Sequence, residues 1–243
     1  MKDGVRGTLI FFNSEGDYVN EIKRQELLMS GFCVIDSFGV IYFEKPGMFD
    51  PSFLIKTCPP YAQFEQIASL ERPSDRVVFP SLLRFALLPN DHLVWGISTR
   101  YELNIVNPDG RLIKKIFKED VPTPVSEDYK DKYYGVLPPG ISKESQNFRK
   151  YFPAFDFIFC DYEGRLFVIT FNKWEGSESY VIDVFDEEGK FIAQTALEIA
   201  DEISLFQDKC IIRNGKFYTK SYTQNDFPVI KRFNIKWNVP ETN

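Results

Sequence analysis

The chain has 243 residues and a formal net charge of −6, from 29 Lys plus Arg and 35 Asp plus Glu. This acidic balance excludes a polybasic surface, so we expect no nucleic-acid partner. With 44% hydrophobic and 26% charged residues the sequence can bury a substantial core, and no run reaches the roughly 18 apolar residues of a membrane-spanning helix. We therefore expect a folded chain without a transmembrane segment.

Short runs of aromatic and β-branched residues, separated by turns rich in acidic residues and glycine, fill most of the chain. The sequence contains 24 Phe, 12 Tyr and 3 Trp, and these residue types favour strands. No stretch of about 12 residues has a clear helical stripe. The best candidates, 65–70 and 196–203, are short. The sequence therefore predicts an all-β fold.

The predicted strands fall into groups along the chain. Four-stranded antiparallel units that repeat every 40 to 50 residues or so are typical of β-propeller blades. We therefore expect a single β-propeller domain over 1–243. A pair of strands at about 8–23 is followed by groups of four at about 32–70, 82–117 and 154–196, and by three strands at about 205–237.

Two classes of turn alternate through these groups. In the first, Asn or Asp stands three residues before a glycine and an acidic residue directly before it; in the second, apolar residues stand two and three positions after a glycine. Glycine reaches positive φ without strain, and an Asn or Asp side chain can bond the turn backbone. Each turn is therefore predicted to be a hairpin corner. The first class centres on Gly16, Gly110 and Gly189, and the second on Gly39, Gly164 and Gly215, with Asp91 in the glycine position of one more turn.

Several of these motifs resemble a known family, the bacterial six-bladed β-propellers related to NHL-repeat and TolB-like proteins. The resemblance covers most of the chain, but its motifs specify blades rather than chemistry. It departs from the family in length, because only about four and a half blades can be recognised. The motifs are Val106-Asn107-Pro108-Asp109-Gly110, Phe185-Asp186-Glu187-Glu188-Gly189, the hairpin from Cys160 to Val168, and the closing stretch from Pro228 to Phe233.

The sequence is compatible with two arrangements of the propeller ring. The last group could take its missing outer strand from the N-terminus, which would give a five-bladed ring without exposed edges. Alternatively, the chain is part of a six-bladed protein whose first strands lie outside it. We favour the second arrangement, because 8–23 carries two strands where closure needs one. The chain would then have an open blade edge and would tend to associate.

The resemblance also bears on location. Similar proteins often work in the bacterial envelope, behind a signal or lipoprotein sequence. Residues 1–30 have no signal-peptide pattern. The resemblance therefore implies an envelope or periplasmic location if an upstream signal is missing, and a cytoplasmic one otherwise.

The segment at about 118–153 is too long to be a mere connection and is predicted to be a functional insertion. Aromatic residues and arginine commonly anchor interfaces. One interpretation is a recognition surface over the channel, in a non-enzymatic binding or scaffold module for a protein, peptide or glycan, without a cofactor. The other is that the aromatics pack back onto the blades. The candidates are Tyr129, Tyr133, Tyr134, Arg149 and Tyr151, with Trp174 from the next connection on the same face.

Asp36 and Asp161 occupy equivalent places at the ends of predicted innermost strands. Paired carboxylates could hold a divalent cation such as calcium in the channel, as in a propeller-type hydrolase or lyase; alternatively, each caps its own turn. The four cysteines lie far apart and His92 is the only histidine, which excludes a zinc site of two cysteines and two histidines. A chain that is purely structural is the third possibility.

Overall fold

The computed structural model describes residues 2–3, 7–13, 15–24, 33–45, 51–71, 77–78, 81–119, 121–135, 147–177, 179–197, 210–213, 215–222 and 228–234. All the candidate site residues fall within these ranges. Parts of the insertion, at 120 and 136–146, lie outside the described residues, as does the stretch 198–209, which contains most of the short helical candidate at 196–203. Among the described residues, no helix has the length and hydropathy needed to span a membrane.

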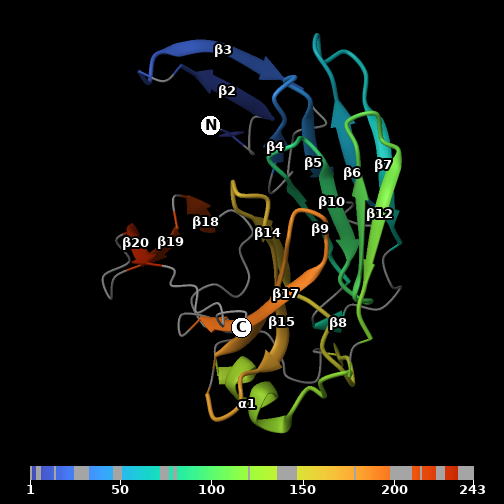
Figure 1. Ribbon diagram of the computed structural model, residues 1–243, viewed down its shortest axis with the longest axis vertical. Helices are drawn as coiled ribbons and strands as arrows, with labels where there is room; N and C mark the ends of the chain where they lie inside the picture. Colours follow the sequence, from blue (N-terminus) through green and yellow to red (C-terminus); the bar gives the residue numbers. More distant parts are fainter. Residues whose placement is uncertain are drawn as a thin grey trace, which may run out of the picture.

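Within the described part of the chain, antiparallel strands form successive sheets, numbered here I to V in chain order (Figure 1). Sheets II, III and IV have four strands each, and sheets I and V have three. Sheet I contains β1 (Lys2–Asp3), β2 (Thr8–Phe12) and β3 (Tyr18–Lys23). Sheet II contains β4 (Cys33–Ile35), β5 (Ile41–Lys45), β6 (Ser52–Thr57) and β7 (Glu65–Leu70). Sheet III contains β9 (Leu83–Leu87), β10 (Leu93–Ile97), β11 (Glu102–Val106) and β12 (Leu112–Phe117). Sheet IV contains β14 (Phe157–Cys160), β15 (Leu166–Lys173), β16 (Tyr180–Phe185) and β17 (Phe191–Leu197), and sheet V contains β18 (Cys210–Arg213), β19 (Lys216–Tyr222) and β20 (Pro228–Asn234).

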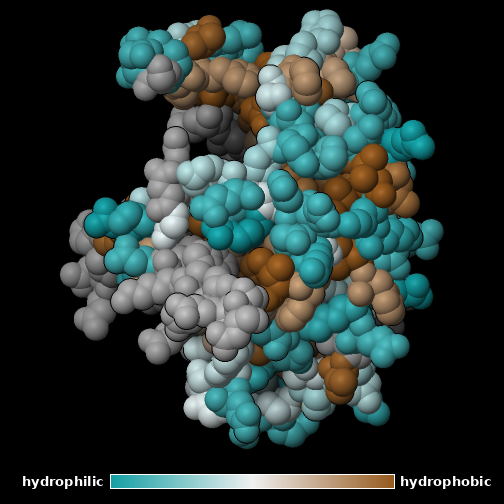
Figure 2. All heavy atoms as spheres, viewed as in Figure 1, coloured by the Kyte–Doolittle hydropathy of each residue, from teal (hydrophilic) through white to brown (hydrophobic). Residues whose placement is uncertain are grey.

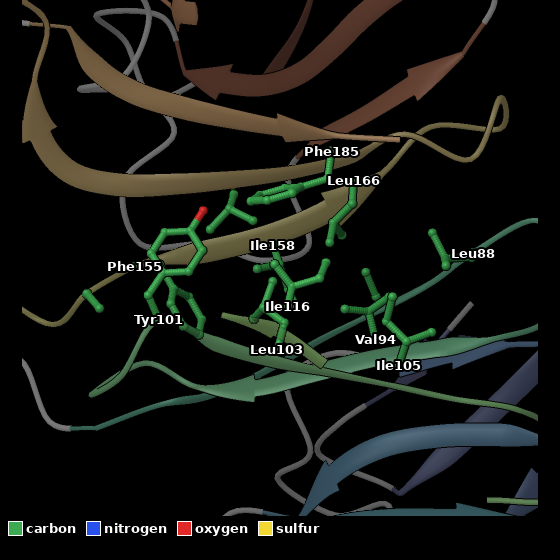
Figure 3. Close-up of a cluster of buried hydrophobic side chains, with 13 residues drawn as sticks. Leu88, Val94, Tyr101, Leu103, Ile105, Ile116, Phe155, Ile158, Leu166 and Phe185 are labelled. Carbon is green, nitrogen blue, oxygen red and sulfur yellow. The ribbon is translucent and has the colours of Figure 1, made fainter. Parts of the chain in front are cut away.

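Each sheet packs against the next through a buried apolar cluster. Ile22 of sheet I meets Phe43 of sheet II, Leu54 of sheet II lies in one cluster with Phe85 of sheet III, and Phe159 of sheet IV lies 6.2 Å from Phe217 of sheet V, ring centroid to ring centroid. Figure 3 shows the cluster between sheets III and IV. The first strands of sheets II to V also follow one another, because β9 contacts both β4 and β14, and β14 contacts β18. Sheets that stack face to face around their first strands form a β-propeller, so the predicted fold class is confirmed.

The groups of strands match the predicted ones, with two differences: the N-terminal sheet has an additional strand, and the insertion contains a helix. The two predicted N-terminal strands, β2 and β3, are joined by β1, which pairs with β2, so sheet I has three strands. Within the described residues, none of these three strands pairs with sheet V. Residues 65–70 form β7, the last strand of the predicted group at 32–70. The prediction contained no helix in the insertion, but α1 (Glu127–Gly135) is one. Blade number and association through an open edge stay predictions.

The turns adopt the predicted conformations. Gly110 has φ +85° and Gly189 has φ +75°. In the turn before Gly189, Asp186 Oδ1 accepts hydrogen bonds from the backbone amides of Glu188 and Lys190, at 3.0 and 2.8 Å. The side chain thus satisfies amides that the tight corner leaves without a backbone partner.

Asp91 takes the glycine position of its turn, as predicted, with φ +62°. A non-glycine residue is strained in this region. Its carboxylate compensates, because Oδ1 accepts a hydrogen bond from the backbone amide of Ser37 at 2.9 Å and Oδ2 contacts the Ser37 hydroxyl. Ser37 lies in the first turn of sheet II, so this corner links two neighbouring sheets.

The two ends of the sheets differ. Because consecutive strands run in opposite directions, the hairpin turns at 36–40, 58–64, 88–92 and 161–165 lie at one end, the turn face. The described residues of the connections that follow β10, β12 and β15 lie at the other end, the connection face. Most of the surface in Figure 2 is hydrophilic, with hydrophobic atoms gathered in separate patches, one of them over the place of β2 and β3.

Candidate functional site

The insertion on the connection face begins with a capped helix. Ser126 precedes α1, and its Oγ accepts a hydrogen bond from the amide of Tyr129 at 3.2 Å. Glu127 and Asp128 place negative charge in the first turn, where it stabilises the helix dipole. The cap and the two acids were a sequence signal for this helix that the strand-based prediction missed. Figure 1 shows α1 beside the end of β15.

Two of the predicted aromatics, Tyr133 and Tyr134, belong to α1 and pack on Phe148. The rings of Tyr133 and Tyr134 stand edge-on to Phe148, with centroids 5.3 and 5.6 Å away. Phe148 belongs to β13 (Asn147–Phe148), which pairs in parallel with β8 (Val77–Val78). Both tyrosines are half-buried, so they hold α1 against this small sheet.

Tyr129 belongs to a second aromatic group, which joins the insertion to sheet IV. Its ring stands edge-on to Phe152, with centroids 5.0 Å apart. Phe152 stacks on Phe171 of β15 at 4.8 Å, and Phe171 in turn contacts Tyr180 of β16 at 6.3 Å. The Thr123 hydroxyl also contacts the side chain of Asn172 in β15. For Tyr129, Tyr133 and Tyr134, the structure supports the packing interpretation.

Two of the other three candidates are more accessible than these tyrosines. Tyr151 and Trp174 are each 40% exposed. The Lys150 ammonium lies 5.1 Å from the ring centroid of Tyr151, and the Arg149 guanidinium donates a hydrogen bond to Ser81 Oγ at 3.1 Å. Trp174 begins the connection between β15 and β16, which its amide closes by donating to the carbonyl of Ser179 at 2.8 Å. The connection face thus presents exposed rings beside cationic side chains.

A buried ion pair fixes the end of the insertion. Arg84 of β9 donates from Nε to the backbone carbonyl of Asp156 at 2.5 Å, and its Nη2 lies 3.4 Å from Asp156 Oδ1. Their side chains are 11% and 9% exposed. No sequence pattern indicates this pair, because the two residues are 72 positions apart and neither belongs to a motif.

The structure places Asp36 and Asp161 on the turn face, opposite the insertion. They lie in sheets II and IV, and Leu88 occupies the equivalent turn position of sheet III between them. Asp161 Oδ1 accepts hydrogen bonds from the backbone amides of Glu163 and Arg165, and Oδ2 pairs with the Arg165 guanidinium at 2.6 Å. Each carboxylate therefore caps its own turn, and the structure does not bring the two together.

Asp36 has a similar environment. Its Oδ1 accepts from the backbone amides of Phe38 and Val40, and its Oδ2 accepts from the Tyr42 hydroxyl at 3.1 Å. Burial and the nearby Asp36 carboxylate raise the pKa of Tyr42, so the phenol stays a hydrogen-bond donor. Within the described residues, no group of three or more His, Cys, Asp or Glu side chains is arranged to hold a metal ion.

The cysteines differ in predicted reactivity. Burial, followed by the charge of Asp161, raises the pKa of the Cys160 thiol to about 12, whereas Cys58 is exposed. Since the thiolate is the nucleophile, iodoacetamide at pH 8 should modify Cys58 in the folded protein and leave Cys160 unmodified until the protein unfolds. Peptide mass spectrometry with and without denaturant measures both rates. Equal rates for the two cysteines in the folded protein would contradict this expectation.

No protein-family model matches the sequence, and no curated protein matches it significantly. Among solved structures, a gluconolactonase from Xanthomonas campestris is 13% identical with a TM-score of 0.47, over 89% of this chain and 63% of that one. A streptogramin B lyase is 11% identical with a TM-score of 0.46, over 98% and 65%. The β-propeller domain of the Trilobed protease from Pyrococcus furiosus is 12% identical with a TM-score of 0.45, over 93% and 74%.

The chain therefore spans less than two thirds of the length of the first two of these structures. All three are similar to it at the level of the fold. Since one fold carries many unrelated activities, function has to be argued from the residues of this chain.

Proposed function

We propose that the protein is a binding module that recognises a protein, peptide or glycan through its connection face. The observation that carries this proposal is the exposure of two aromatic rings on the connection face. Tyr151 lies at the end of the insertion, which other aromatics hold in place, and Trp174 lies in the connection between β15 and β16. Exposed aromatic rings supply large contact areas and lose little conformational entropy on binding. A surface of this kind binds without any catalytic group.

The packed aromatics support the proposal as well as the exposed ones. The stack of Phe152 on Phe171 and the Arg84–Asp156 pair attach the end of the insertion to sheets III and IV. A ligand that meets a preformed surface does not have to order it, which favours affinity. The charged residues around the two rings are of both signs, since Lys150, Lys173 and Glu175 are all exposed. Such a mixed polar rim is typical of interfaces.

The test compares two double variants. Tyr151→Ser with Trp174→Ser removes the exposed rings of the connection face. Phe38→Ser with Tyr162→Ser is the matched control, because these two aromatics are 69% and 52% exposed on the turn face. Ligands are identified on arrays of peptides and glycans with the unmodified protein, and their affinities for each variant are then measured by calorimetric titration.

The connection-face variant should weaken binding at least about tenfold, and the control should leave it unchanged. The free energy of unfolding of both variants should stay within about 0.5 kcal/mol per substitution of the parent value. Equal affinity of the two variants would refute the proposal. A loss of several kcal/mol in the connection-face variant alone would instead show that its rings serve packing.

The alternative function, a hydrolase or lyase with a divalent cation held by Asp36 and Asp161, stays a prediction. Any cation would have to compete with the turn hydrogen bonds that both carboxylates accept. Calorimetric titration with calcium measures this directly: heat that disappears in Asp161→Asn would support the alternative. Kinship with the six-bladed NHL-repeat and TolB-like propellers is likewise proposed, on the hairpin motifs that the structure places at the blade corners.

A further inference from the structure

A surface pocket lies on the turn face, far from the insertion, at the corner between β6 and β7. Its volume is about 590 Å³, and residues 56–60 and 62–65 line it. This volume falls within the range of small-molecule sites. The corner stands at the top of the view in Figure 1.

The pocket contains a buried cation. The side chain of Lys56 is only 9% exposed, and its ammonium lies 3.2 Å from Glu65 Oε2. Within the described residues, Glu65 is the one acceptor that contacts this ammonium, which has three N–H donors. A buried charge without its full set of hydrogen bonds is unfavourable, so the ammonium can bind a further acceptor that enters the pocket.

The lining also has an apolar part, and two hydrogen bonds fix its shape. Pro59, Pro60 and Phe64 form its apolar part. The Thr57 hydroxyl donates a hydrogen bond to the carbonyl of Gln63 at 2.7 Å, and the Tyr61 hydroxyl donates to the carbonyl of Gly39 at 3.1 Å. These two bonds hold the corner against its own sheet, so the pocket exists before any ligand arrives.

We propose that this pocket binds a small carboxylate with an apolar body. The Lys56 ammonium donates to the ligand carboxylate, and the prolines and Phe64 pack against its apolar part. Glu65 is a competitor for the same ammonium, and its side chain is 67% exposed, so it can turn into solvent when the ligand binds. This site does not depend on the connection face or on the function proposed for it.

The experiment uses phenylacetate as the probe, with phenylacetamide as its uncharged counterpart. Binding is measured by calorimetric titration. The second, local readout is the rate at which iodoacetamide modifies Cys58, which lines the pocket, with Cys33 as the internal reference. Phenylacetate should bind, and it should slow the modification of Cys58 but not of Cys33. Phenylacetamide should bind at least about tenfold more weakly, because it lacks the charge that strengthens the hydrogen bond.

Variants assign the effect to the buried cation. Lys56→Met, which keeps the side-chain length, should weaken phenylacetate binding at least about tenfold. Lys115→Met is the matched control, since Lys115 pairs across two strands with Glu102 at 2.6 Å but does not line this pocket. Glu65→Gln removes the competitor from an exposed position and should tighten binding several-fold.

The Glu65→Gln variant keeps the proposal testable if Lys56→Met fails to fold. Binding that Glu65→Gln leaves unchanged or weakens would overturn the proposal. The same conclusion would follow if phenylacetate did not bind at millimolar concentrations, if the amide bound equally well, or if Cys58 were not protected.

Discussion

Replacing Asp183 by alanine is expected to lower the free energy of unfolding by about 3 kcal/mol or more. The Asp183 side chain is fully buried in β16. It accepts hydrogen bonds from the Tyr101 hydroxyl at 2.7 Å, the Lys118 ammonium at 2.6 Å and the Gln194 amide at 2.7 Å. Tyr101 and Lys118 belong to the sheet III side of this interface, so the carboxylate links two neighbouring sheets.

The loss is large because alanine leaves the partners without an acceptor. Tyr101 is buried, so its hydroxyl has no easy access to water, whereas Lys118 is 30% exposed and can be partly solvated. The Asp183→Asn variant keeps the side-chain shape and an acceptor oxygen but loses the charge facing Lys118. It should therefore be destabilised less than the alanine variant.

Urea unfolding of the variants measures both effects. Asp109→Ala is the control, because Asp109 is exposed in the turn after β11, and it should change the free energy of unfolding by no more than about 0.5 kcal/mol. If Asp183→Ala were as stable as this control, the bonds between the sheets would contribute nothing.

Replacing Phe155 by alanine should lower the free energy of unfolding by about 3–5 kcal/mol. Phe155 is fully buried between sheets III and IV, where its ring lies 5.9 Å from that of Tyr101 (Figure 3). The packing is tight, since a Cβ added at Gly96 would lie 3.2 Å from Phe155 Cζ and 2.6 Å from the Glu102 carbonyl oxygen. The surroundings cannot easily collapse into the cavity that alanine would leave.

Phe155 also ends the insertion, so its removal tests whether that segment is anchored by the core. Phe38→Ala, at a side chain 69% exposed on the turn face, is the control for the loss of an aromatic ring. Thermal unfolding followed by circular dichroism should show a large decrease in Tm for Phe155→Ala and almost none for Phe38→Ala. Similar Tm values for the two variants would contradict the expected role of Phe155.

The features that sequence could predict are those that short-range chemistry determines. Gly110 and Gly189 have the positive φ that their turns require, and Asp91 occupies a glycine position as the repeat indicated. These signals lie within a few residues of each other, so they can be read without knowing the fold. The order of strands in sheets II to IV follows from them.

Apart from α1, whose signal is local, the features that sequence did not predict depend on distant contacts. The partners of Asp183 and Arg84 are 82 and 72 residues away, at Tyr101 and Asp156. Nothing in the local pattern of these residues indicates a partner. The sequence indicated the aromatics of the insertion as candidates, but only the structure separates the packed Tyr129 from the more exposed Tyr151.

Because strand directions alternate, the pocket lined by Lys56 on the turn face and the exposed Trp174 on the connection face lie at opposite ends of the propeller. A strand such as β6, with 6 residues, is about 20 Å long. A small carboxylate in the pocket would therefore not touch a ligand bound at the connection face. The protein could then hold both at the same time, and saturating one should leave affinity for the other unaltered. If both proposed sites bind their ligands, the protein would act as a bridge that brings a small carboxylate and a protein, peptide or glycan into one ternary assembly without any change of shape.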